Sequence, residues 1–95
     1  MNNEDNFLFI SNLCKNINAE ISFLENKEGI IATMSKKSAL TNNYEISSLP
    51  KKDKDTACLA IMKQLLFSDI AKFIGIPETS SLDELKLKIN ILFPA

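Results

Sequence analysis

The stretch from Asp53 to Gly75 contains the longest apolar run with helical spacing in the chain, and it limits how the other segments can pack. In its first half, apolar side chains gather on an arc of about 160°. In its second half, they gather on another arc, which is rotated by about 90° from the first. The first arc comprises Cys58, Ile61, Met62, Leu65 and Leu66, and the second comprises Phe67, Ile70, Phe73 and Ile74.

One straight helix cannot direct both arcs at one flat sheet, so two alternatives stay open. The helix breaks near residues 67–68, with Ser68 or Asp69 capping a second helix, or it stays whole and its far end packs on a different neighbour. Gly75 ends the segment in either case, because glycine is the usual residue just past a helix. The second arc, with Phe67 at its edge, is where we expect a helix break or a contact with a partner.

A first helix is predicted from about residue 4 to residue 17, with Asn3 as its cap. Two large apolar residues, Leu8 and Phe9, fall off its apolar stripe and must find a second surface or stay exposed. The stripe itself comprises Phe7, Ile10, Leu13, Cys14 and Ile17.

Two strand patterns around a short polar turn predict a β-hairpin over residues 19–34. The first pattern alternates apolar and polar residues, and the second is a β-branched run. Gly29 ends the four-residue loop 26–29 and supplies the positive φ that such a loop usually needs. A short third strand is predicted over residues 44–47, and Pro50 ends it because proline has no amide proton to give to a ladder.

The last segment has two interpretations. Ser81 followed by Glu84 fits a capping box and predicts a helix from Leu82 to about Phe93. The rival is a strand, because apolar and polar residues alternate over 85–91. We favour the helix, since the cap signal is specific and Leu, Lys and Glu favour helices.

These segments predict an α+β fold in one domain, residues 1–95: a three-stranded antiparallel sheet, in the order α-β-β-β-α-α, with the helices packed mainly on one face. The other face of that sheet then has to be explained. Its outward residues include Ser22, Thr33 and either Ile30 or Ile31, which is enough apolar character to bind a partner.

The polar composition argues against catalytic sites, metal sites and phosphate-binding sites. The chain has twelve acidic residues and eleven basic ones, all of them lysine, so its charges nearly balance. It lacks the guanidinium groups that are best suited to binding phosphate. The absence of histidine excludes imidazole bases and removes the commonest metal ligand. We therefore expect no enzymatic activity, no catalytic residue, no cofactor and no metal site.

Cys14 and Cys58 lie far apart among apolar residues, so we expect buried, reduced thiols and a cytoplasmic location. The apolar run at 7–10 follows acids and is too short for a signal peptide, so we expect the mature chain to start at Met1. No stretch approaches the roughly 20 apolar residues of a membrane span. The excess of Lys, Asn and Ile without Arg is typical of an AT-rich bacterium, phage or mobile element.

Two resemblances imply nucleic-acid binding. The order helix, three strands, helix, with Lys51 and Lys52 near the start of the second helix, resembles double-stranded RNA-binding domains. Residues 69–76, followed by Ser80 and Leu85, resemble the first helix and turn of a helix-turn-helix, which implies DNA contact by a corner at 69–93. Acids oppose both, because Asp53 and Asp55 lie among those lysines and Glu78, Asp83 and Glu84 would face phosphates.

A third resemblance implies protein binding. Residues 21–23 with Gly29, then residues 46–50 before 57–66, are similar to the small acidic chaperones of bacterial secretion systems. Those chaperones present a helix, a three-stranded antiparallel stretch and a dimerising helix, so the resemblance implies effector binding and a dimer.

We therefore expect a small non-enzymatic protein-binding module: an adaptor, an inhibitor or a chaperone-like accessory protein, with a homodimer as one form. The alternative is a nucleic-acid-binding domain, which the charges argue against. The expected partner-binding residues are the apolar ones left over after the core is assigned. They are Leu8, Phe9, Ile31 and Phe67.

Overall fold

The computed structural model describes residues 5–36 and 44–94, and it has the predicted α+β fold with the element order α-β-β-β-α-α-α. The predicted Asn3 cap and the loop 37–43 lie outside the described residues. The elements are α1 (Asp5–Ile17), β1 (Glu20–Asn26), β2 (Gly29–Lys36), β3 (Tyr44–Ser47), α2 (Lys54–Gln64), α3 (Ser68–Ile74) and α4 (Leu82–Leu92).

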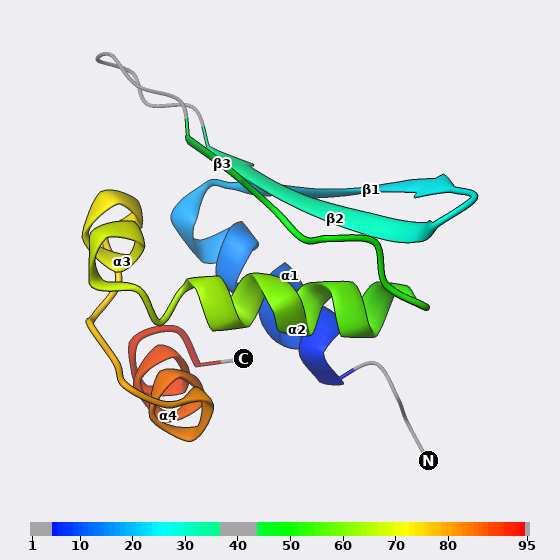
Figure 1. Ribbon diagram of the computed structural model, residues 1–95. Coiled ribbons are helices and arrows are strands. Elements are labelled where there is room, and N and C mark those ends of the chain that lie inside the picture. The colour runs from blue at the N-terminus through cyan, green and yellow to red at the C-terminus, as the bar shows by residue number, and fades with distance from the viewer. Residues whose placement is uncertain (1–4, 37–43, 95) are drawn as a thin grey trace.

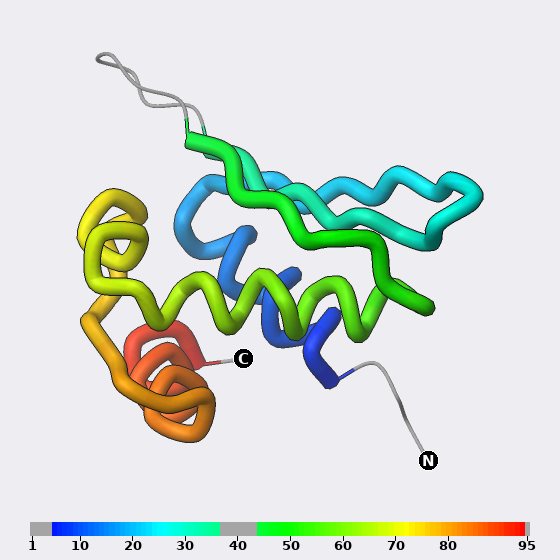
Figure 2. Tube along the Cα trace, in the orientation of Figure 1, coloured from blue at the N-terminus to red at the C-terminus, as the bar shows by residue number. Residues whose placement is uncertain are grey.

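The helices lie on one side of the sheet, as predicted. Figure 1 shows α1 and α2 beneath one face, while no described element covers the opposite face. Figure 2 shows the chain leaving α2, turning through α3 near the start of β3, and descending to α4. None of the helices in the described ranges is long and apolar enough to cross a membrane.

The sheet has the order β1-β2-β3, with both pairs antiparallel. Asn26 pairs with Gly29, so the hairpin loop has two residues between the paired strands rather than the predicted four. Gly29 has the predicted positive φ, at 136°. A Cβ there would lie 2.5 Å from the carbonyl oxygen of Lys51, so this position also requires glycine for space.

The chain stays beside β2 after β3 has ended. Ser48 N donates to Ala32 O at 2.9 Å, and Ile30 and Lys51 exchange backbone hydrogen bonds of 2.8 and 2.9 Å. Two residues, 49 and 50, therefore lie between the two bonded positions of this segment, whereas a single residue of β2, Ile31, lies between Ile30 and Ala32. The extra residue makes a bulge at residues 49–50. Pro50 was predicted to end the third strand, but β3 ends earlier, at Ser47, and pairing with β2 resumes after Pro50 at Lys51. The bulge accommodates Pro50 because it needs no donor from this residue.

The core lies between the covered face of the sheet and the helices. Ala32 and Met34 of β2 are fully buried, and so is the first arc of α2 except for half-buried Leu66. Cys14 and Cys58 are buried free thiols, as predicted. The other large side chains that are fully buried are Ile10, Leu13, Leu85 and Ile89.

Of the two alternatives for residues 53–75, the break is the one observed. α2 ends at Gln64 and α3 begins at Ser68, with extended Phe67 as its N-cap residue. The prediction that Ser68 or Asp69 caps the second helix is wrong, because both lie inside its first turn and Phe67 makes no side-chain cap. Because the chain turns between α2 and α3, the first apolar arc and the rotated second arc lie on separate helices. Each helix can therefore direct its own apolar face at a neighbouring part of the molecule.

The C-terminal segment is a helix, so the strand interpretation is wrong. The hydroxyl of Ser81 accepts a hydrogen bond from Glu84 N at 3.2 Å, which is the first half of the predicted capping box. Leu85 and Ile89 are buried against the core.

Candidate functional site

The four residues predicted to bind a partner do not form one surface. Leu8 and Phe9 both line a cavity of about 280 Å³ between α1 and α4, where Leu8 is 53% exposed and Phe9 is half-buried. Ile31 lies on the open face of the sheet, opposite Leu24. Phe67 is 63% exposed at the junction between α2 and α3.

A more apolar cavity lies between β3 and α3, and its volume is about 300 Å³. The second arc supplies one wall through Ile70, Phe73 and Ile74, while Tyr44 and Ile46 of β3 supply the other. We call this cavity the β3–α3 groove. Its complete lining is Tyr44, Glu45, Ile46, Gln64, Asp69, Ile70, Phe73 and Ile74.

Local structure holds the two walls of the groove in place. The Gln64 side-chain amide at the end of α2 donates to the carbonyl oxygen of Ser47 at 2.7 Å, which ties this helix end to β3. The rings of Tyr44 and Phe73 meet edge to face, with centroids 5.6 Å apart. Since Ala71 of α3 is also fully buried, the short helix is anchored on its inner side.

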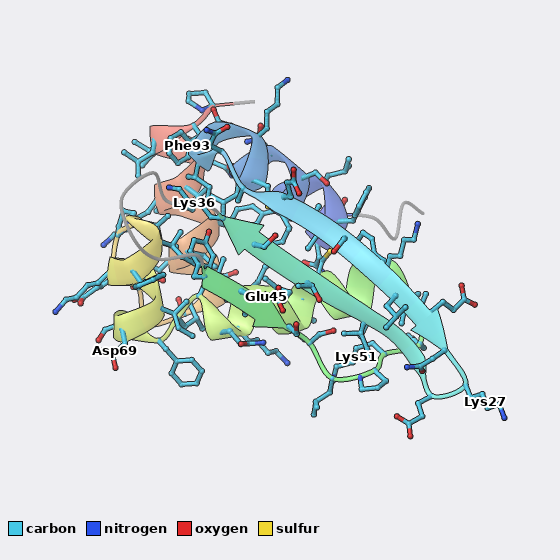
Figure 3. The ribbon with its side chains drawn as sticks, turned by 90° about the horizontal axis from the view of Figure 1, so that it is seen from above. Lys27, Lys36, Glu45, Lys51, Asp69 and Phe93 are labelled. Atoms are coloured by element: carbon cyan, nitrogen blue, oxygen red, sulfur yellow. The ribbon has the colours of Figure 1, made fainter. Side chains whose placement is uncertain are left out.

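Among the described residues, the charged side chains that line the groove are two carboxylates, Glu45 and Asp69. Figure 3 shows them on the two elements that form the walls, β3 and α3. The neighbouring Lys72 of α3 does not line the groove, and its amine lies 3.6 Å from a carboxylate oxygen of Glu78. The groove therefore combines an apolar interior with an acidic rim.

The hydroxyl of Tyr44 is buried and has no hydrogen-bond partner among the described residues. Burial, and to a lesser extent the nearby Cys14, raises the pKa of Tyr44 far above its ordinary value. The phenol is therefore neutral at physiological pH, and this wall of the groove contributes aromatic surface without charge.

Potential metal ligands are dispersed among the described residues, and both thiols are buried. Within 5–36 and 44–94, no group of three or more potential ligands is placed to hold a metal ion. Burial raises the pKa of the Cys14 thiol to about 11 and, with a smaller contribution from Asp55, that of Cys58 to about 12. Both thiols are therefore protonated and shielded near neutral pH, which makes them poor nucleophiles.

The lysines and the helical corner that resemble nucleic-acid-binding proteins do not form one basic surface. Figure 3 shows Lys36 and Lys51 toward opposite ends of the sheet. Residues 75–81 join α3 to α4, and this connection is longer than the three to four residues of a helix-turn-helix turn. α4 then opens with Asp83 and Glu84 in its first turn.

The residues of one wall of the groove belong to the second apolar arc, whereas those of the other wall belong to the third strand. The rotated second arc was the signal for Ile70, Phe73 and Ile74, because it could not face the same surface as the first arc. Nothing in the sequence pattern indicated that Tyr44 and Ile46 would face this arc. Comparison of the chain with protein-family models, with curated proteins and with solved structures finds no significant match.

Proposed function

We propose that this chain is a small non-enzymatic protein-binding module, an adaptor, inhibitor or chaperone-like accessory protein, that holds a segment of its partner in the β3–α3 groove. One observation carries the proposal. The groove is lined by five apolar or aromatic side chains, yet Phe73 in its wall is 53% exposed. Large aromatic side chains held in this half-open state are typical of surfaces that become buried in a complex.

The size of the groove favours a side chain of a partner over a free metabolite. Pockets for drug-sized ligands hold about 300–1,000 Å³ and bury most of the ligand. This groove lies at the bottom of that range and is open along Phe73. A large apolar anchor from another protein fits these dimensions, because only the anchor needs to be enclosed.

The acidic rim adds a charge requirement to this partner. With Glu45 and Asp69 as the lining charges, a lysine or arginine next to the anchor would find a complementary carboxylate. The proposed partner segment is therefore an aromatic or aliphatic residue flanked by basic residues.

Selection from a random peptide library displayed on phage tests this proposal with the purified full chain as bait. We expect enrichment of peptides that carry a large apolar residue beside lysine or arginine. The affinity of the best peptide should fall roughly tenfold for Phe73→Ala, because that change removes an anchor contact.

Leu87→Ala is the matched control, since Leu87 is also an exposed apolar residue, at 62%, but lies on α4 outside the groove. Its peptide affinity should equal that of the unaltered chain. Failure to enrich any peptide family, or equal effects of the two substitutions, would contradict binding at the groove.

A further inference from the structure

The outer edge of β1 has backbone groups that no other strand meets. The backbone groups of Ile30 and Ala32 bond to residues 48–51 on the β3 side of β2. The N–H and C=O groups of successive residues in a strand point alternately to its two sides. The residues of β2 that hydrogen-bond to β1 are therefore the alternate ones, which include Ile31 and Thr33. Their partners in β1 are Leu24 and Ser22, so the intervening residues direct N–H and C=O away from the sheet. Those outward residues are Ile21, Phe23 and Glu25.

The two edges of the sheet differ in how far their outward backbone groups are already hydrogen-bonded. β3 has four residues, and its outward Ser47 carbonyl accepts a hydrogen bond from Gln64. β1 has seven residues, and no described residue outside the sheet bonds to its outward backbone groups. Figures 1 and 3 agree that α1 lies below β1 and that no described element lies beside it at the level of the sheet. A long open edge of this kind is a template for another strand.

Side chains along the same edge are also incompletely covered. Ile21 and Phe23 face the helices, opposite Met34 and Ala32, which are fully buried. Ile21 and Phe23 themselves are only half-buried, although Phe23 contacts the ring of Phe7 at a centroid distance of 5.7 Å. A further strand next to β1 would cover both side chains.

We propose that β1 pairs antiparallel with β1 of a second copy of this chain, about a two-fold axis through Phe23, so that the two sheets become continuous. In this register the outward residues hydrogen-bond to one another, with Ile21 opposite Glu25 and Phe23 opposite its own copy. All residues of β1 are paired, because Glu20 then lies opposite Asn26 and Ser22 opposite Leu24.

Charge pattern is the reason for choosing a second copy as the occupant. The strand carries two carboxylates, Glu20 and Glu25, and the two-fold pairing places neither opposite another carboxylate. Moving the axis one residue toward the turn would place Glu20 opposite Glu28. Moving the axis one residue in either direction also leaves two residues of β1 outside the pairing, so the axis through Phe23 is the register that pairs the whole strand with its own copy, as a two-fold interface requires. This inference concerns the opposite edge of the sheet from the β3–α3 groove and does not depend on the proposed function.

Two double substitutions test the register. Ser22 and Leu24 are exposed on the open face of the sheet, so both can be changed without entering the core. In Ser22→Glu/Leu24→Glu, like charges face each other across the dimer at two places, and the dissociation constant should rise roughly tenfold. In Ser22→Lys/Leu24→Glu, opposite charges face each other, and the dissociation constant should stay close to that of the unaltered chain.

Sedimentation equilibrium on the full chain measures these constants, and circular dichroism checks that each variant is folded. Hydrogen exchange on the unaltered chain is an independent readout, because the amides of Ile21, Phe23 and Glu25 should gain protection as concentration rises. The amide of Leu24, which already bonds within the sheet, should change little. A monomer at all concentrations from roughly 1 µM to 1 mM would overturn the proposal, and so would equal dissociation constants for the two double variants.

Discussion

At the scale of single residues, Gly29 carries two constraints at once. It closes the hairpin with φ of 136°, and it leaves room for the Lys51 carbonyl oxygen, 2.5 Å from where a Cβ would be. Gly29→Ala should therefore lower the free energy of unfolding by about 3 kcal/mol, through backbone strain and displacement of the chain after β3. Chemical denaturation measures this loss.

Gly75 is the matched control for this prediction. It also has a positive φ, of 88°, but nothing lies within 4 Å of the position of a Cβ. Gly75→Ala should cost about 1 kcal/mol, from backbone conformation alone. Equal losses for the two variants would show that the contact with Lys51 does not constrain Gly29.

Because the two thiols are buried, we predict that the free energy of unfolding falls at alkaline pH. Burial raises the pKa of Cys14 to about 11 and that of Cys58 to about 12, from an ordinary value of 9.0. The thiols ionise more readily in the unfolded chain, so the stability that they contribute is complete below pH 9 and is lost as pH rises toward these folded values. Denaturant unfolding between pH 7 and 10.5 should show a decline that begins near pH 9.

A Cys14→Ala/Cys58→Ala variant separates this effect from the titration of other groups. Its stability should be lower at every pH, because two buried side chains are shortened. Its decline between pH 9 and pH 10.5 should be shallower than that of the unaltered chain. Parallel curves would mean that the thiols do not drive the alkaline loss.

At the scale of elements, Asp55 joins two helices. Its carboxylate accepts hydrogen bonds from the backbone N–H groups of Asn6 and Phe7, at 2.9 and 3.0 Å, and from the side-chain amide of Asn6 at 2.9 Å. An acid in the first turn of α2 therefore satisfies free donors at the start of α1. No pattern in the sequence indicated this contact between the two helices.

We predict that Asp55→Ala lowers the free energy of unfolding by about 1–2 kcal/mol, as the loss of a helix cap does. Hydrogen exchange should show faster exchange for the amides of Asn6 and Phe7, because their acceptor is removed. Asp83→Ala is the control, since Asp83 is an exposed first-turn acid of α4. The cap assignment fails if Asn6 and Phe7 exchange at the same rate in both variants.

Elements defined by local pattern were predicted well, and contacts across the chain were not. Gly29, the β-branched run after it and the Ser81 cap each act within a few residues, so the hairpin and α4 were readable from sequence. The break after α2 was one of two open alternatives, because two apolar arcs indicate a change of direction without saying how it is made. The hydrogen bonds of Asp55 to α1 join residues nearly fifty positions apart, and no local pattern encodes them.

For the whole molecule, none of the four residues expected to bind a partner lines the β3–α3 groove. Leu8, Phe9, Ile31 and Phe67 were chosen because each was left over from a local apolar stripe. The packing of α4 and α3 determines the surroundings of Leu8, Phe9 and Phe67, whereas the alternation of side chains along β2 places Ile31 on the open face of the sheet. The same packing brings Phe73 to Tyr44, two residues that belong to different patterns in the sequence.

The distribution of charge predicts weak interaction with polyanions. The formal net charge is -1, Lys36 and Lys51 lie toward opposite ends of the sheet, and α4 begins with acids. The chain should therefore pass through a heparin column at low salt, because few lysines can contact one polyanion together. Retention followed by elution with rising salt would instead favour the nucleic-acid-binding alternative.

The central claim is that the β3–α3 groove holds a partner protein, and site-specific photocrosslinking in the native cells tests it most directly. A benzophenone amino acid at position 73 should give a discrete adduct whose cross-linked peptide contains a large apolar residue beside lysine or arginine. The same amino acid at position 87, on the exposed face of α4, should not give that adduct. No adduct at position 73, or the same adducts from both positions, would contradict the claim.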